Sequence, residues 1–294
     1  MQKLLIVGCG DVARRALPLL TRRYRVYALL RDASQAAVWR QGGAVPLLAD
    51  LDRPESLKRI AGLADLVLHL APPPDSGRRD KRTRRLLAAL GSAKSLPQGL
   101  VYISTSGVYG DCGGARVDES RLPRPASSRG ARRLDAESTL RAWGARTGVR
   151  VSILRAPGIY AADRLPLARL QAGTPALATG DDVYTNHIHA DDLARLCAAA
   201  LVRGRANRVY NASDDGEMKM GEYFDCVADA FGLPRPPRLA RAEAGKVLSP
   251  LQLSFMNESR RLSNRRLKTE LRCPLLHPRV DLAVAAMAAA QKKN

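Results

Sequence analysis

The stretch KLLIVGCGDVARR, residues 3–15, decides how this chain folds. It opens with LLIV, a continuous apolar run that predicts a strand buried on both faces of a parallel sheet. Gly8, Gly10 and Ala13 follow at G-x-G-x-x-A spacing, and Asp11 is placed to cap a helix. The glycines permit a tight turn and a close approach of the backbone to a pyrophosphate. Strand, turn and helix in this order predict a dinucleotide-binding site at the helix N-terminus.

The N-terminal half continues this alternation of strands and helices. Further apolar runs predict strands over residues 24–30, 45–48, 65–70 and 99–104. Strands that alternate with helices through short links predict an α/β fold with a doubly wound parallel sheet. We expect this dinucleotide-binding domain over residues 1–155, completed by a returning strand near 208–212. We expect residues 156–294 to form a smaller, mostly helical substrate annex over the carboxyl ends of the strands.

The residue type after the second strand bears on the choice of cofactor. Arg31 stands 21 positions after Gly10, where an acid would bind the ribose 2′-hydroxyl of NAD and an arginine suits the 2′-phosphate of NADP. NADP is therefore favoured, and NAD is the alternative if Asp32 binds the ribose. Asp50 is expected beside the adenine or as the cap of the next turn. The predicted cofactor residues are Gly8, Gly10, Asp11, Val12, Arg31, Asp50, Ala71 and Pro157.

Composition limits the classes of partner. The formal net charge is +20, from 48 basic and 28 acidic residues, so polyanions would be attracted. The basic residues are spread along the chain, and no zinc-finger or RNP1-like pattern occurs, which argues against specific nucleic-acid binding. The five cysteines never show C-x-x-C spacing, which argues against disulfides and a metal site. Without a signal peptide or an apolar run of about 18 residues, we expect a soluble, cytoplasmic protein and no membrane association.

Several motifs follow one another in the middle of the chain. They are TSGVYG at 105–110, DES at 118–120, LRAPGIY at 154–160, NHIHADDLA at 186–194 and VYN at 209–211. In type and order they resemble motifs of the extended short-chain dehydrogenase/reductases, the NAD-dependent epimerase/dehydratase family. RLSN at 261–264 resembles a late segment of atypical members. The resemblance implies a Rossmann-type fold, a small-molecule substrate and a homodimer formed through two long helices.

The chain departs from this family at the catalytic pair. The family carries Tyr-x-x-x-Lys, in which tyrosine exchanges a proton with the substrate, lysine binds the nicotinamide ribose, and a serine or threonine orients the substrate oxygen. Thr105 matches the serine or threonine. Arg129 stands where tyrosine belongs and Arg133 where lysine belongs. Arg133 can still bind the ribose, but a guanidinium with a pKa above about 12 does not exchange protons near neutrality.

Three interpretations follow from this departure. In the first, the protein is an atypical oxidoreductase or epimerase, Arg129 binds an anionic group of a small, nucleotide-sugar-like substrate, and Tyr109, Tyr160 or a water supplies the proton. In the second, it is an NADP-dependent sensor or interaction module without catalysis. In the third, the basic surface serves nucleic acid. We rank them in this order. Asn186 and Arg155 are expected as substrate contacts or as structural polar groups.

Overall fold

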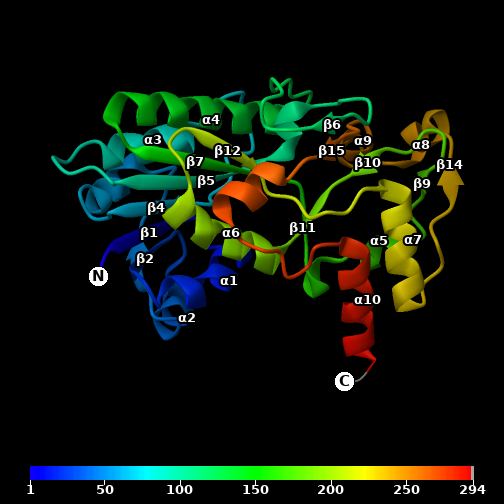
Figure 1. Ribbon diagram of the computed structural model, residues 1–294, viewed down its shortest axis with the longest axis horizontal. Helices are drawn as coiled ribbons and strands as arrows, with labels where there is room; N and C mark the ends of the chain where they lie inside the picture. Colours follow the sequence, from blue (N-terminus) through cyan, green and yellow to red (C-terminus); the bar gives the residue numbers. More distant parts are fainter. Residues whose placement is uncertain (293–294) are drawn as a thin grey trace.

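The computed structural model describes residues 1–292, and its centre is a seven-stranded parallel sheet (Figure 1). The strand order is β3-β2-β1-β4-β5-β7-β12. The strands are β1 (Lys3–Val7), β2 (Arg25–Leu30), β3 (Val45–Leu48), β4 (Leu66–His69), β5 (Gly99–Thr105), β7 (Arg150–Ala156) and β12 (Arg208–Asn211). Every neighbouring pair is parallel. The predicted doubly wound sheet is confirmed, and the returning strand forms one of its edges.

Helices cover both faces of the sheet because each central strand is apolar on both sides. In β1, Leu4 and Ile6 pack into the cluster that includes α1 and α6, whereas Leu5 and Val7 pack into the cluster that includes α3 and α4. Figure 1 shows α3 and α4 together above the strands, whereas α1 and α6 pack against each other on the other face of the sheet. The helices beside the sheet are α1 (Asp11–Leu20), α2 (Ala36–Gln41), α3 (Lys81–Leu90), α4 (Ser128–Thr147) and α6 (Ala190–Arg203). None of the helices within residues 1–292 is long and apolar enough to cross a membrane.

Helix α6 packs on the sheet and not in the annex, where we expected it. Its residues fall in the range expected for the annex, but the helix packs against α1 on the sheet. The physical reason is its apolar stripe at positions i, i+3, i+4 and i+7, which is formed by Leu193, Leu196, Cys197 and Ala200 and is fully buried. The helix therefore belongs to the core of the dinucleotide-binding domain.

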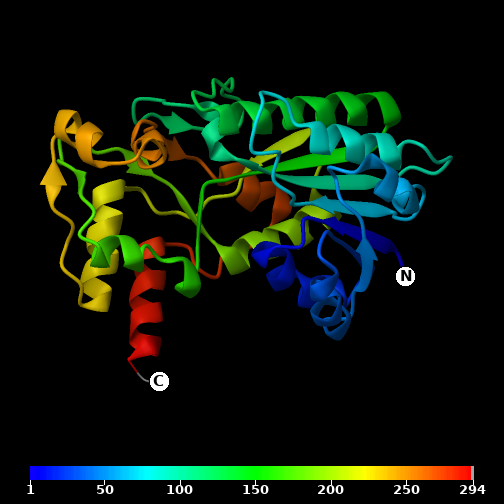
Figure 2. The same ribbon diagram turned by 180° about the vertical axis from the view of Figure 1, so that it is seen from behind.

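The annex gathers at the end of the sheet farthest from the N-terminus, as Figure 2 shows. Its helices are α5 (Leu167–Gln171), α7 (Met220–Phe231), α8 (Arg241–Val247), α9 (Pro250–Met256) and α10 (Val280–Gln291). Its short strands are β8 (Gly158–Tyr160), β9 (Ala176–Leu177), β10 (Tyr184–Thr185), β11 (His187–His189), β13 (Met218–Lys219) and β14 (Arg238–Leu239). The annex has its own apolar core, to which Phe224, Val227 and Val284 contribute.

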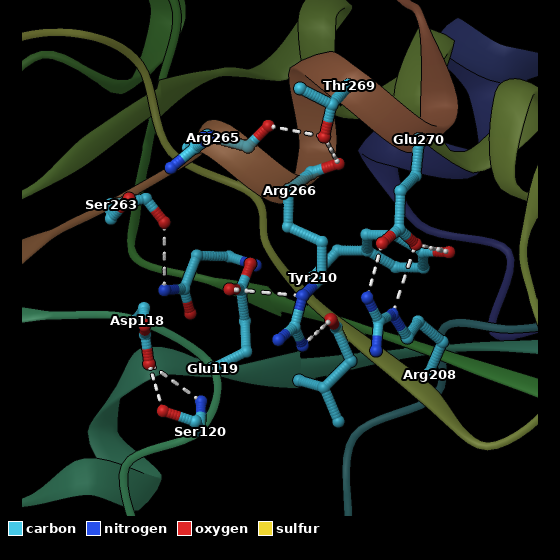
Figure 3. A network of polar contacts seen from close by, with 12 residues as sticks. Asp118, Glu119, Ser120, Arg208, Tyr210, Ser263, Arg265, Arg266, Thr269 and Glu270 are labelled. Carbon is cyan, nitrogen blue, oxygen red and sulfur yellow. Dashed lines mark hydrogen bonds and ion pairs between the residues drawn. The ribbon is translucent and has the colours of Figure 1, made fainter.

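Downstream of α9 the chain returns to the sheet and is fixed there by polar contacts (Figure 3). Strand β15 (Arg261–Leu262) pairs with β6 (Arg116–Val117). The Glu119 carboxylate accepts a hydrogen bond from the backbone N–H of Asn211 at 2.8 Å and lies 3.5 Å from the Arg266 guanidinium. Arg208 and Tyr210 on β12 both donate hydrogen bonds to Glu270. The DES and RLSN motifs therefore join the returning segment to the sheet edge.

A buried ion pair joins α4 to β7. The Arg155 guanidinium donates to both carboxylate oxygens of Glu137, at 3.1 and 2.7 Å, and both side chains are buried. The Arg155 guanidinium also lies over the ring of Tyr109, 4.6 Å from its centroid. Of the two roles expected for Arg155, the structure therefore supports the structural one.

The ion pair predicts a large effect of neutralising one partner. Glu137→Gln leaves the Arg155 charge buried without a counterion, which costs about 3–5 kcal/mol of unfolding free energy. Urea unfolding followed by circular dichroism measures this loss. Arg141→Gln, an exposed position on the same helix, is the control and should change the free energy by less than about 0.5 kcal/mol. A loss for Glu137→Gln no larger than that of the control would contradict the prediction.

Candidate functional site

A cavity of about 500 Å³ opens at the carboxyl ends of β1, β2, β3 and β4. Ligands of open α/β sheets bind at this edge, outside the carboxyl ends of the strands. The predicted cofactor residues that line the cavity are Gly8, Gly10, Asp11, Val12, Arg31, Asp50 and Ala71. Pro157 lines a neighbouring cavity instead. The glycine-rich turn and the ends of three further strands therefore come together as the sequence analysis expected.

Gly8 allows the ends of β1 and β4 to meet. Its φ is +96°, and a Cβ on this residue would lie 2.2 Å from the backbone nitrogen of Ala71. The backbone N–H groups of Leu70 and Ala71 both donate to the carbonyl of Val7, at 2.7 and 3.0 Å. Any side chain at position 8 would collide with this backbone. The first glycine of the motif is thus required by the fold itself as well as by the expected approach of a pyrophosphate.

Asp11 has a different role from the expected helix cap. Helix α1 begins at Asp11, its cap residue is Gly10, and no side chain caps it. The Asp11 carboxylate instead lies 3.0 Å from Arg15, one turn along the helix, and 3.4 Å from Arg164 of the annex turn η4 (Ala162–Arg164). Arg164 also lines the cavity. Two arginines therefore balance the negative charge of Asp11 beside the helix N-terminus.

The end of β2 distinguishes the roles of Arg31 and Asp32. The two carboxylate oxygens of Asp32 accept hydrogen bonds from the backbone N–H and the hydroxyl of Ser34, at 2.9 and 2.6 Å, and these bonds lower the pKa of Asp32. Arg31 lines the cavity and makes no hydrogen bond or ion pair through its side chain within residues 1–292. The acid is occupied in a local turn, whereas the guanidinium is available to a ligand.

Arg133, on α4, lines the wall of this cavity. Its Nη1 donates to the carbonyl of Ile103 at 2.7 Å and to the Tyr102 hydroxyl at 3.0 Å. Its Nε and Nη2 donate no hydrogen bond to any residue in the described part of the chain, 1–292. These bonds orient the guanidinium, and the remaining N–H groups can bind a ribose hydroxyl.

A second cavity, of about 280 Å³, lies between the sheet and the annex. Its walls include Thr105, Ser106, Arg129, Pro157, Tyr184, Met220, Phe255, Glu258 and Arg260. The structure thus brings the predicted residues Thr105 and Arg129 to one cavity. The Thr105 hydroxyl oxygen accepts a hydrogen bond from the Gly107 N–H at 3.2 Å, so its own hydrogen remains available to a ligand oxygen.

The charges around the second cavity do not cancel. Arg260 pairs with Glu258 at 2.8 Å and donates to the Gly110 carbonyl at 2.8 Å. Arg129 forms no ion pair among the residues that the structure describes, and its guanidinium lies over the Phe255 ring, 4.5 Å from the centroid. Desolvation lowers the pKa of Arg129, and the charge of Glu258 opposes this shift. The cavity therefore carries one uncompensated positive charge.

The two tyrosines expected to supply a proton lie outside this cavity. Tyr109 is buried, and its hydroxyl donates to the Asn211 side chain at 2.8 Å; burial raises its pKa to about 12. Tyr160 is buried in the annex core, and burial raises its pKa as well. The phenol that lines the cavity is Tyr184, whose hydroxyl makes no hydrogen bond within residues 1–292. No sequence motif marks Tyr184, because the pairing of β10 with β13 places it there.

Asn186 also lines this cavity, but its amide is occupied. It donates to the Arg260 carbonyl at 2.8 Å and accepts from the Leu262 N–H at 2.8 Å. It therefore holds the returning segment, which is the structural role among the two that we expected.

Three side chains lie close enough together to be considered as metal ligands, but their other contacts do not suit a bound cation. Ligand atoms of His189, Asp191 and His277 lie within 4.8 Å of one another. The imidazoles of His189 and His277 lie with their centroids 3.8 Å apart, and Nδ1 of His189 already accepts a hydrogen bond from the Asp191 N–H at 3.2 Å. Asp191 is paired with Arg15 at 2.7 Å. We assign no metal to this cluster.

Comparison with known proteins agrees with the fold described above. Residues 5–213 match the model of the NAD dependent epimerase/dehydratase family, so the chain belongs to this family. A 3-diazoavenalumate denitrifying reductase from Streptomyces sp is 25% identical, over 94% of this chain and 97% of that protein.

Two solved structures show the same fold over the whole chain. A conserved protein of unknown function from Silicibacter pomeroyi has a TM-score of 0.81 and 28% identity, covering 99% of this chain and 100% of that one. A UDP-glucose 4-epimerase from Thermotoga maritima has a TM-score of 0.78 and 18% identity, covering 100% and 99%. The family resemblance inferred from the motifs is confirmed.

The close approach at Gly8 predicts a severe effect of one methyl group. Gly8→Ala forces the turn away from Ala71 and should weaken dinucleotide binding at least tenfold, as measured by calorimetric titration with NADPH. Gly245→Ala is the matched control, because a Cβ there meets no atom within 4 Å. Equal NADPH affinity of both variants would show that the turn does not shape the site.

Proposed function

We propose that the protein is an NADP(H)-dependent oxidoreductase that acts on a small anionic substrate. The observation that carries this proposal is that three elements contribute to both cavities. Strand β5 contributes Ile103 to the first and Thr105 to the second, and α4 contributes Arg133 to the first and Arg129 to the second. The segment that enters the annex contributes Ile159 to the first cavity and Pro157 to the second. A cofactor in the larger cavity would adjoin a substrate in the smaller one.

The residues of the larger cavity suit a phosphorylated dinucleotide. The Gly8 turn leaves room for a pyrophosphate at the N-terminus of α1, Arg31 offers a free guanidinium for a 2′-phosphate, and Arg133 offers N–H groups for the nicotinamide ribose. When bound, this cofactor supplies or accepts a hydride. NADP is the cofactor that these residues favour.

The residues of the smaller cavity suit the polar steps of carbonyl reduction. The Thr105 hydroxyl donates a hydrogen bond to the substrate oxygen and orients it. Tyr184 supplies the proton to that oxygen as the alcohol forms, in place of the missing family tyrosine, and solvent returns the proton to the phenolate. Arg129 binds the anionic group of the substrate, because its charge has no ion-pair partner within residues 1–292. In the oxidative direction Tyr184 accepts the proton.

An NADP-dependent sensor without catalysis is the alternative, favoured by the arginine at the family's tyrosine position. The two functions differ in one measurement. A panel of 2-oxo acids with NADPH, followed by the loss of NADPH absorbance, shows turnover for an oxidoreductase. Tight NADPH binding without turnover of the panel or of aldehydes would favour the sensor.

Charge reversal at the end of β2 tests the choice of cofactor. Arg31→Asp places a carboxylate where the 2′-phosphate is expected, so NADPH affinity should fall at least 30-fold, about 2 kcal/mol, while NADH affinity is kept or improved. Calorimetric titration with both cofactors measures this change. An equal loss for NADPH and NADH would contradict a phosphate-binding role of Arg31.

Removal of one hydroxyl tests the proton donor. Tyr184→Phe should lower kcat for the best substrate of the panel by about 10²-fold or more, with little change in KM, because general acid catalysis contributes about 10²–10⁴-fold. Tyr109→Phe is the control, since that hydroxyl lies outside the cavity. An unchanged kcat in Tyr184→Phe would exclude the phenol as the donor.

A further inference from the structure

We infer that the smaller cavity binds an aromatic monocarboxylate, with Arg129 holding the carboxylate and Phe255 packing against the ring. This inference rests on the proposed function, because it takes the smaller cavity as the substrate site. It goes beyond that function in naming the chemical class, which differs from a nucleotide sugar in charge, size and polarity.

The charge balance of the cavity selects a single negative charge. Glu258 neutralises Arg260, and the Arg260 guanidinium is further held by the Gly110 carbonyl. Arg129 remains as the one cation on the cavity wall without an ion pair in residues 1–292. A planar guanidinium pairs with a carboxylate through two parallel hydrogen bonds. A ligand with two charges, such as a pyrophosphate, would find an uncompensated cation for only one of them.

The other walls of the cavity offer apolar and aromatic surface. Phe255, on the last turn of α9, is 45% exposed and lines the cavity, and Met220 and Pro157 are further apolar parts of the lining. The Tyr184 ring lies 4.9 Å from the Arg261 guanidinium, so a cation already holds it in place. A flat ring that enters here would cover the exposed Phe255 side chain, and an aromatic pair is more favourable than the area that it buries accounts for.

The size of the cavity agrees with one ring and a short acid group. Its volume is about 280 Å³. Cavities that enclose drug-sized ligands measure about 300–1,000 Å³, so this cavity lies just below that range. A sugar joined to a nucleoside through a pyrophosphate needs far more space. Thr105 on the cavity wall would then face the oxygen that reacts.

Ligand binding tests this inference without knowledge of the natural substrate. The full chain is titrated calorimetrically with cinnamate, with its neutral amide cinnamamide, with cyclohexanecarboxylate and with UDP-glucose, each with and without saturating NADP⁺. We expect cinnamate to bind at least tenfold more tightly than each of the other three. Arg129→Gln should remove this preference for cinnamate over cinnamamide, whereas Arg129→Lys should retain part of it.

Two controls separate charge from packing. Arg141→Gln removes an exposed arginine from the same helix and should leave cinnamate affinity unchanged. Phe255→Leu should weaken cinnamate severalfold and leave cyclohexanecarboxylate unchanged, since only the aromatic pair is lost.

Several outcomes would overturn the inference. They are equal binding of cinnamate and cinnamamide, tighter binding of UDP-glucose, and no binding of cinnamate at millimolar concentration. The titration with NADP⁺ in the same samples tests the proposed function separately. If NADP⁺ does not bind but cinnamate does, the cofactor proposal fails and the carboxylate site stands.

Discussion

The contact between the Gly8 turn and the backbone of Ala71 is the constraint on which the site depends. The ends of β1 and β4 approach so closely that no side chain fits between them, and both N–H groups of the β4 end bond to Val7. This approach leaves the N-terminus of α1 facing the cavity, and the ends of β2 and β3 complete its wall. The shape of the cavity at this edge of the sheet therefore depends on glycine at position 8.

Helix α4 carries three charged residues with different contacts along one of its faces. Arg129, Arg133 and Glu137 follow one another at spacings of four residues, so they lie on the same side of the helix. The first lines the smaller cavity, the second lines the larger cavity, and the third forms the buried ion pair with Arg155. That ion pair fixes the helix against β7 and so fixes the depth at which the two arginines enter the cavities. The buried ion pair and the two arginines that line the cavities thus share one rigid element.

The annex completes the smaller cavity only because the chain returns to the sheet. Asn186 and Glu119 hold the segment that follows α9, and Glu270 receives hydrogen bonds from β12. This return places Phe255 and Glu258 opposite Thr105, although some 150 residues separate them in sequence. The family tyrosine is absent, but residues of the sheet, of α4 and of the annex still line one cavity at this place. Because these residues lie around one cavity, we favour a catalytic function over cofactor binding alone.

The sequence by itself determined the parallel sheet, the glycine-rich turn, the position of Arg31 at a strand end and the pair Arg129 and Arg133. These features are local, because backbone sterics and helix periodicity act between residues close in sequence. Only the tertiary structure decided that α6 packs on the sheet, that Asp11 pairs with two arginines, and that Tyr184 lines the smaller cavity in place of Tyr109 or Tyr160. Each of these depends on contacts between segments far apart in the chain, and no local pattern encodes which distant partner a side chain will meet.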